Sequence, residues 1–184
     1  MMKKQLIATL VATLVLFIWQ SLSWSMLHVH GAETQYTPKQ TEILEFLSQN
    51  MEEGQYFLPT VPPDMPRSEH QAAMEAAIGK PWATISYHPK MEINMGMNLF
   101  RGFVANLVAA WFIVWLLMQF AKVDLKTGVL ASLAVGTIGY LTIPYLNSVW
   151  FEGSTIGYLI DTVVQWGLVG VWLGWYLRSG GQGT

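Results

Sequence analysis

The sequence contains no cysteine and few charged residues. Without cysteine the chain has no disulfide, no thiolate-bound metal or iron–sulfur cluster, and no covalent haem attachment. Only 12% of the 184 residues are charged, against about 25% in an ordinary soluble domain. The net charge is −2 and no block of basic residues occurs, so we expect no nucleic-acid partner.

Apolar residues are abundant instead, and they gather in long runs. Hydrophobic residues make up 52% of the chain, and nine residues are tryptophan. A helix needs about 20 apolar residues to cross the hydrocarbon core of a bilayer. Runs of about this length occupy residues 5–27, 98–120, 128–146 and 155–177. The sequence therefore predicts an all-α membrane protein, a four-transmembrane-helix bundle.

The first run follows Lys3 and Lys4, as in a secretory signal peptide. It continues to spanning length, however, and no A-x-A cleavage pattern follows it. We interpret residues 1–30 as a first transmembrane helix that serves as an uncleaved signal anchor, with a cleaved signal peptide as the alternative.

Residues 31–97 form the only long polar segment. It combines two amphipathic or Ala-rich stretches, typical of helices, with two short alternating stretches, 55–58 and 82–88, typical of strands. We predict a small exterior α+β cap inserted between the first two membrane helices. Residues 98–178 would form a three-helix transmembrane region, and the Gly-rich residues 179–184 a flexible tail.

The lysines and arginines of the short loops fall on one side of a four-span protein. They are Lys3, Lys4, Lys122, Lys126 and Arg178. This asymmetry predicts that both termini are cytoplasmic. The segment 31–97 would then be periplasmic, and the protein would lie in the inner (cytoplasmic) membrane of a bacterium.

Three stretches carry a resemblance to known sequences: the aromatic Phe17-Ile18-Trp19, the glycine-rich last two spans, and the turn Phe151-Glu152-Gly153. They resemble small multi-span bacterial membrane proteins that share a domain of unknown function. The resemblance covers the first span and residues 128–177, and the 31–97 insertion departs from it. It implies a multi-span membrane protein and no catalytic residue.

Asp161 is the only carboxylate inside the last apolar run. A carboxylate there costs about 2.5–3.5 kcal/mol on insertion scales, so it should face protein or water. On a helix, Tyr158 and Gln165 share its face. The site is either a structural polar pair near the outer surface or an ion or proton site. We expect Arg101, at the outer end of the second helix, to neutralise it, with Tyr158 or Gln165 as the fallback donor.

Glycines form a small-residue face on each of the last two spans, which lets two helix backbones approach closely. We predict that these spans pack against each other as an antiparallel hairpin. The residues expected at this interface are Gly136, Gly139, Gly167, Gly170 and Gly174.

His28 and His30 follow the first span and suggest a metal or haem ligand pair. No other span contains a histidine that could complete a two-histidine haem site. We therefore interpret them as polar residues at the membrane surface and expect no metal and no other cofactor.

No catalytic constellation occurs, so we do not expect an enzyme. The first hypothesis is a non-catalytic accessory or scaffold subunit, docking other membrane subunits or a second copy through its cap and helix faces within the lipid bilayer. The alternative is a small transporter or sensor that uses Asp161. A polar cavity that reaches Asp161 would favour the alternative, and a dry core would favour the subunit.

Overall fold

The computed structural model describes residues 2–178. The predicted tail, 179–184, lies outside the described residues. The chain is mostly helical with one two-stranded sheet, and it divides into two compact units. The first unit comprises the residues up to Gln35 together with those from Asn94 onward, and the second comprises Tyr36–Ile93.

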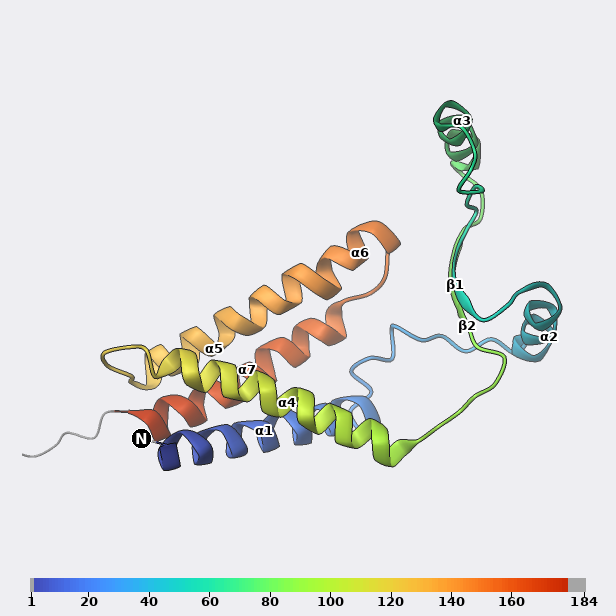
Figure 1. The fold of residues 1–184 in the computed structure, drawn as a ribbon. Helices are drawn as coiled ribbons and strands as arrows, with labels where there is room; N and C mark the ends of the chain where they lie inside the picture. The colour runs from blue at the N-terminus through green and yellow to red at the C-terminus, as the bar shows by residue number, and fades with distance from the viewer. Residues whose placement is uncertain (1, 179–184) are drawn as a thin grey trace, which may run out of the picture. The chain divides into compact units, whose positions relative to one another are not determined.

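The first unit contains four helices that are long and apolar enough to cross a membrane, as predicted. They are α1 (Met2–Ser25), α4 (Met95–Leu117), the rod that starts with α5 (Leu125–Tyr140), and α7 (Ile156–Leu177). The rod continues through a π-helical turn, η1 (Leu141–Tyr145), into α6 (Leu146–Phe151), as Figure 1 shows.

The third apolar helix is longer than the predicted 128–146 at both ends, and it continues past Pro144. Proline lacks the N–H that an α-helix needs, and the wider π turn accommodates this within one continuous helix. The apolar helix therefore runs from Leu125 to Phe151.

The core of this unit lies where α1, α4 and α7 meet. Small residues at four-residue spacing, Ala8 and Ala12, let α1 approach its neighbours, and Leu16 continues the buried stripe. Helices α1 and α7 are antiparallel: Trp172 Nε1 donates to the Ala8 carbonyl near one end, and Trp19 contacts Asp161 near the other. The other fully buried apolar residues are Ala110, Ile113, Val114, Leu117, Val169 and Leu173.

Helices α5 and α7 are in backbone contact through glycine, as the small-residue faces predict. A Cβ added at Gly170 would lie 2.7 Å from the Val129 Cα, and one added at Gly174 would lie 2.8 Å from the Leu125 Cα. At Gly136 an added Cβ would meet the Trp166 ring at 2.3 Å. A side chain at any of these positions would push the helices apart.

The prediction was wrong for Gly139 and Gly167, where an added Cβ would meet nothing within 4 Å. Gly139 lies beyond the Trp166 contact, where the α5–α6 rod leaves α7, and it borders a cleft rather than a helix. The helical spacing placed the glycines on a face but could not show where the two helices diverge.

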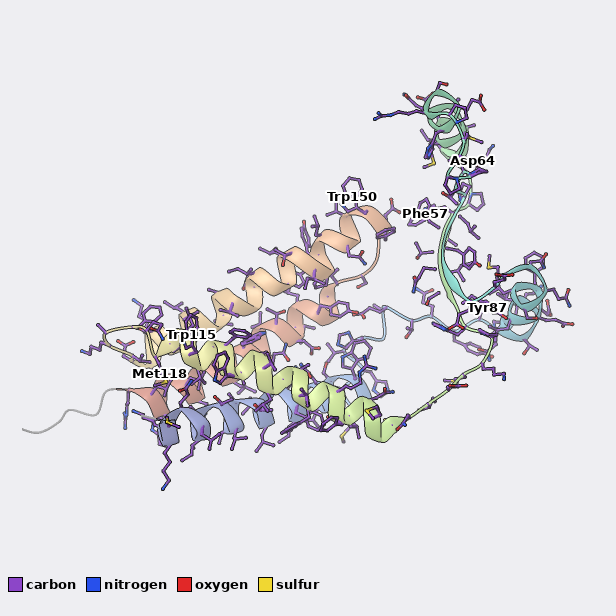
Figure 2. All side chains as sticks on the ribbon, viewed as in Figure 1. Phe57, Asp64, Tyr87, Trp115, Met118 and Trp150 are labelled. Carbon is purple, nitrogen blue, oxygen red and sulfur yellow. The ribbon has the colours of Figure 1, made fainter. Side chains whose placement is uncertain are left out.

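The second unit contains α2 (Gln40–Asn50), β1 (Gly54–Leu58), α3 (Arg67–Ala77) and β2 (Ala83–Tyr87). The two strands match the predicted stretches to within one residue and pair antiparallel, with Gly54 opposite Tyr87. Phe57 of β1 and Tyr87 of β2 are labelled in Figure 2. Tyr87 is the only buried hydrophobic residue of Tyr36–Ile93, so this unit has very little core of its own.

Candidate functional site

Asp161 is buried in α7, with 7% of the residue exposed, and three donors surround it. Trp19 Nε1 donates to Oδ1 at 2.9 Å, and the Ser23 hydroxyl donates to the same oxygen. These two donors lie four residues apart on α1 and therefore on one face of that helix. His30 Nε2 lies 2.9 Å from the other oxygen, Oδ2. Each carboxylate oxygen thus has a partner inside the protein.

His30 connects Asp161 to a second carboxylate. Its Nδ1 lies 2.7 Å from Glu33 Oε1, in a turn closed by the Glu33 amide donating to the His30 carbonyl. The imidazole stacks on the Trp24 ring at 3.8 Å and meets the Tyr158 ring edge-on at 5.1 Å. These contacts fix the plane of the imidazole, so both of its nitrogens are directed at carboxylates. We call these residues the Asp161–His30–Glu33 chain.

Gly157 makes room for this chain at the start of α7. A Cβ added there would lie 2.7 Å from both Glu33 Oε1 and His30 Nδ1. Such distances are shorter than van der Waals contact, so any side chain at Gly157 would displace the pair. The present positions of His30 and Glu33 against α7 therefore depend on the glycine.

The geometry determines how many protons the Asp161–His30–Glu33 chain holds. A neutral imidazole has one donor and one acceptor nitrogen, whereas an ionised carboxylate only accepts. With a carboxylate at each nitrogen of His30, either the ring is an imidazolium or one carboxyl is protonated. Burial by itself lowers the pKa of His30, but the hydrogen bonds and charges of Asp161 and Glu33 outweigh it and raise the pKa above 6.5.

A second polar group lies one turn deeper between α1, α4 and α7. Gln20 Nε2 lies 3.2 Å from both Asn106 Oδ1 and Gln165 Oε1, and Asn106 Nδ2 donates to Gln20 Oε1 at 2.8 Å. These amides satisfy one another in a region where an unpaired polar group would be costly. Polar residues of three helices thus extend from the Asp161–His30–Glu33 chain into the bundle.

The partner expected for Asp161 was wrong. Arg101 is exposed on α4, and no hydrogen bond or ion pair joins it to Asp161 among residues 2–178. Of the fallback donors, Gln165 bonds to Gln20, and Tyr158 contacts His30 through its ring. The helical spacing placed Tyr158 and Gln165 near Asp161, but the donors come from α1 and the stretch after it.

The two histidines do not form one site. His28 is exposed, whereas His30 is buried. Within the described part of the chain, no group of three or more His, Asp or Glu side chains is arranged to hold a metal ion. In the Asp161–His30–Glu33 chain the imidazole lies between the carboxylates, so the three groups do not converge on one point.

A cleft of about 1250 Å³ adjoins the Asp161–His30–Glu33 chain. Glu33 and Asp161 both line this cleft. Its walls come from the end of α1, residues 32–35, the rod from α5 to α6, and the first half of α7. Figure 1 shows the rod and α7 separating toward the α6 end. The Tyr140 hydroxyl and the Thr155 hydroxyl, 3.0 Å apart, connect the two walls. The cleft reaches Asp161, but polar and apolar residues both line it, so it is not the wholly polar cavity expected of a transporter or sensor.

Sequence reasoning missed four residues of this site: Trp19, Ser23, Glu33 and Gly157. Two local signals were available: Trp19-x-x-x-Ser23 places two donors on one helix face, and Gly157-x-x-x-Asp161 places a glycine one turn before the carboxylate. Nothing local indicated that residues 30–33 fold back onto a helix about 130 positions away.

Comparison with known proteins gives no match: no family model, no curated protein and no solved structure is significantly similar to this chain.

Proposed function

We propose that the protein is a non-catalytic, multi-pass protein of the bacterial inner membrane that binds a small solute in the cleft beside Asp161, as a small transporter or sensor. One observation carries the proposal: a cleft of about 1250 Å³ has the buried Asp161–His30–Glu33 chain in its wall. Ligand pockets are usually about 300–1000 Å³, so the cleft is large enough for a small organic molecule.

The Asp161–His30–Glu33 chain is more than a stability element requires. A buried ion pair is often no more stabilising than apolar residues of similar volume, so packing alone does not account for three ionisable groups in an apolar bundle. Ionisable groups within membrane helices commonly mark solute or ion pathways. The position of Glu33 and Asp161 on the cleft wall fits this use.

The second candidate is the accessory or scaffold subunit, which a separate observation favours. An apolar groove between α1 and α4 is lined by Leu6, Leu107, Val108, Trp111 and Phe112, among others. Such a groove fits a helix of another membrane subunit or of a second copy. Purification in a gentle detergent, followed by native mass spectrometry, would show a bound subunit or a dimer under this candidate and a monomer otherwise.

For orientation we propose that both termini are cytoplasmic and that residues 36–93 are periplasmic. The Lys and Arg asymmetry of the short loops supports this. The contribution of Trp19 and Ser23 to the Asp161 site supports retention of α1 as an uncleaved anchor. A reporter fused after Thr184 should be active in the cytoplasm, and one inserted at Pro63 should be active outside it. A cytoplasmic signal from Pro63 would contradict this topology.

Two glycines provide a matched test of solute binding. Gly139 and Gly167 both have open space where a Cβ would be, but only Gly139 lines the cleft. Gly139→Phe should therefore occupy part of the cleft and obstruct solute binding without disturbing the packing, and Gly167→Phe should leave the cleft open.

The measurement is the melting temperature of the detergent-purified protein with a panel of amines, amino acids, carboxylic acids, sugars and nucleosides. A solute present at about 100 times its Kd stabilises the native state by about 2.7 kcal/mol. We expect at least one class to raise the melting temperature of wild type and Gly167→Phe but not of Gly139→Phe. No shift with any class, or an equal shift in both variants, would contradict the proposal.

A further inference from the structure

The charged residues that line the cleft are all acidic. Of the described residues that line it, three carry carboxylates, Glu33, Glu152 and Asp161, and none is Lys or Arg. His30 lies between two of these carboxylates with one ring face covered by Trp24, and the three groups share one extra proton, whether the ring or a carboxyl carries it. This proton therefore offsets one carboxylate charge without offering a free donor to an anion. The potential in the cleft is negative, and an anionic solute would meet no positive group.

Aromatic rings complete the lining. They are Trp24, Tyr140, Trp150, Phe151, Tyr158 and Trp166. Trp24 stacks on His30 through one ring face but is 56% exposed, so its other face is open, and Trp150 is 73% exposed. Figure 2 shows Trp150 projecting from α6. The face of a tryptophan ring attracts a weakly hydrated cation within about 6 Å, and such aromatic lining recognises quaternary ammonium groups.

The size and arrangement of the groups favour an organic cation over a metal ion. A metal ion needs several oxygen or nitrogen ligands converging within about 2.0–2.6 Å. No group of three or more His, Asp or Glu side chains converges in this way among residues 2–178, and the cleft is far larger than a single ion. A large cation with a delocalised or shielded charge satisfies both the carboxylates and the rings without close coordination.

We propose that the solute class of this cleft is an organic cation, such as a quaternary ammonium or phosphonium ion. This inference depends on the proposed solute-binding function and names the chemistry of its ligand. Glu33 and Glu152 supply the charge attraction, and Trp24 and Trp150 supply the ring faces.

The test uses three probes of similar shape and different charge: tetraphenylphosphonium, neutral triphenylphosphine oxide and the anion tetraphenylborate. Binding to the full chain in detergent is measured by isothermal titration calorimetry, and the signal of protein-free micelles is subtracted. We expect saturable binding of tetraphenylphosphonium and none of tetraphenylborate. Gly139→Phe should abolish the saturable component, which assigns it to the cleft.

Two substitutions test which residues attract the cation, and a third is the control. Glu152→Gln removes an exposed charge from the cleft wall and should weaken binding about three- to tenfold. Trp150→Ala removes an exposed ring and should weaken binding about two- to fivefold. Glu45→Gln, an exposed position in α2, is the control and should leave binding unchanged.

Saturable binding of the neutral or anionic probe, blocked by Gly139→Phe, would overturn the cation inference but keep solute binding. No saturable binding of tetraphenylphosphonium would also overturn the cation inference, and the solute panel described above would then decide separately whether the cleft binds anything. Tetraphenylphosphonium binding that is unchanged in Glu152→Gln and Trp150→Ala would likewise contradict it.

Discussion

Each of the two units contains a histidine–carboxylate pair of the same length in very different surroundings. His30 lies 2.9 Å from Asp161 with side chains 5% and 9% exposed, and His88 lies 2.9 Å from Glu53 with side chains 61% and 63% exposed. Pairing of the strand ends explains the second contact, because Glu53 and His88 flank the paired residues Gly54 and Tyr87. An imidazole and a carboxylate therefore lie at the same distance in both pairs, but the His30–Asp161 pair is buried and the His88–Glu53 pair is exposed to solvent.

The comparison shows that distance alone does not measure the importance of such a pair. An exposed pair is screened by water and contributes about 0–1 kcal/mol to stability. Breaking a buried pair leaves an uncompensated charge in a medium of low dielectric and costs about 3–5 kcal/mol. The extra donors at Asp161, and the absence of a Cβ at Gly157, occur only at the buried pair.

The largest difference is expected when each histidine is removed. His30→Ala would leave Asp161 and Glu33 buried without the cation between them and should lower the free energy of unfolding by about 3–5 kcal/mol. His88→Ala should change it by less than about 1 kcal/mol. The measurement is denaturation in detergent, followed by circular dichroism for both variants. Equal losses would show that burial does not distinguish the two pairs.

Gly157 tests whether the buried pair depends on close packing. Gly157→Ala would place a methyl group 2.7 Å from both His30 and Glu33 and should destabilise the protein by about 1–3 kcal/mol. Gly167→Ala, in the same helix with no neighbour near its Cβ, should instead stabilise by about 0.5–1 kcal/mol. If both alanine variants had the same melting temperature, the close approach at Gly157 would have no energetic role.

Replacing Asp161 by asparagine removes the charge but keeps the shape of the side chain, so it should reduce stability less than His30→Ala. Asp161→Asn keeps an oxygen for Trp19 and Ser23, and its NH₂ can donate to a neutral His30, so only the charge-assisted part of the network is lost. We expect a loss of about 1–2 kcal/mol, against less than about 0.5 kcal/mol for Glu53→Gln at the exposed pair. A loss of the size expected for His30→Ala would mean that the negative charge itself, rather than hydrogen bonding, holds the site together.

The smallest expected effect is on pH dependence. The pKa of His30 is raised in the folded protein, so the stability that it contributes is complete below its ordinary pKa of 6.5. That contribution is lost as the pH rises through the higher folded pKa. The titratable groups that face the ring are Asp161, Glu33 and Tyr158. His30→Gln should therefore reduce the fall in melting temperature above pH 6.5, and His88→Gln is the matched control. An unchanged slope in His30→Gln would contradict the assignment.

Much of the fold follows from local sequence. The four apolar helices follow from run length, and the two strands follow from alternation between turn-forming residues. The third helix was predicted too short at both ends: it begins at Leu125 and continues through a π turn at Pro144 to Phe151. Local patterns also could not show that residues 31–35 lie with the helices, so that the second unit begins at Tyr36.

The site was predictable only in part. The cost of a carboxylate in an apolar run identified Asp161 as a residue that needs partners, but its partners depend on tertiary structure. Arg101 was expected from depth along the helix, yet depth does not specify which side of the helix a residue faces. His30 reaches Asp161 because an irregular turn follows α1, with His28 at a φ of 50°. Such a turn has no periodicity from which to predict it.

Gly157 has a consequence for recognising this site in other sequences. The close approach at this glycine links two short patterns that are far apart in the chain, H-x-x-E after the first apolar helix and G-x-x-x-D at the start of the last. Together with W-x-x-x-S near the end of the first helix, they form a signature that requires no overall similarity. In a chain with the same arrangement of apolar helices, a larger residue in place of this glycine would indicate that the histidine and the glutamate do not take the positions that they have here.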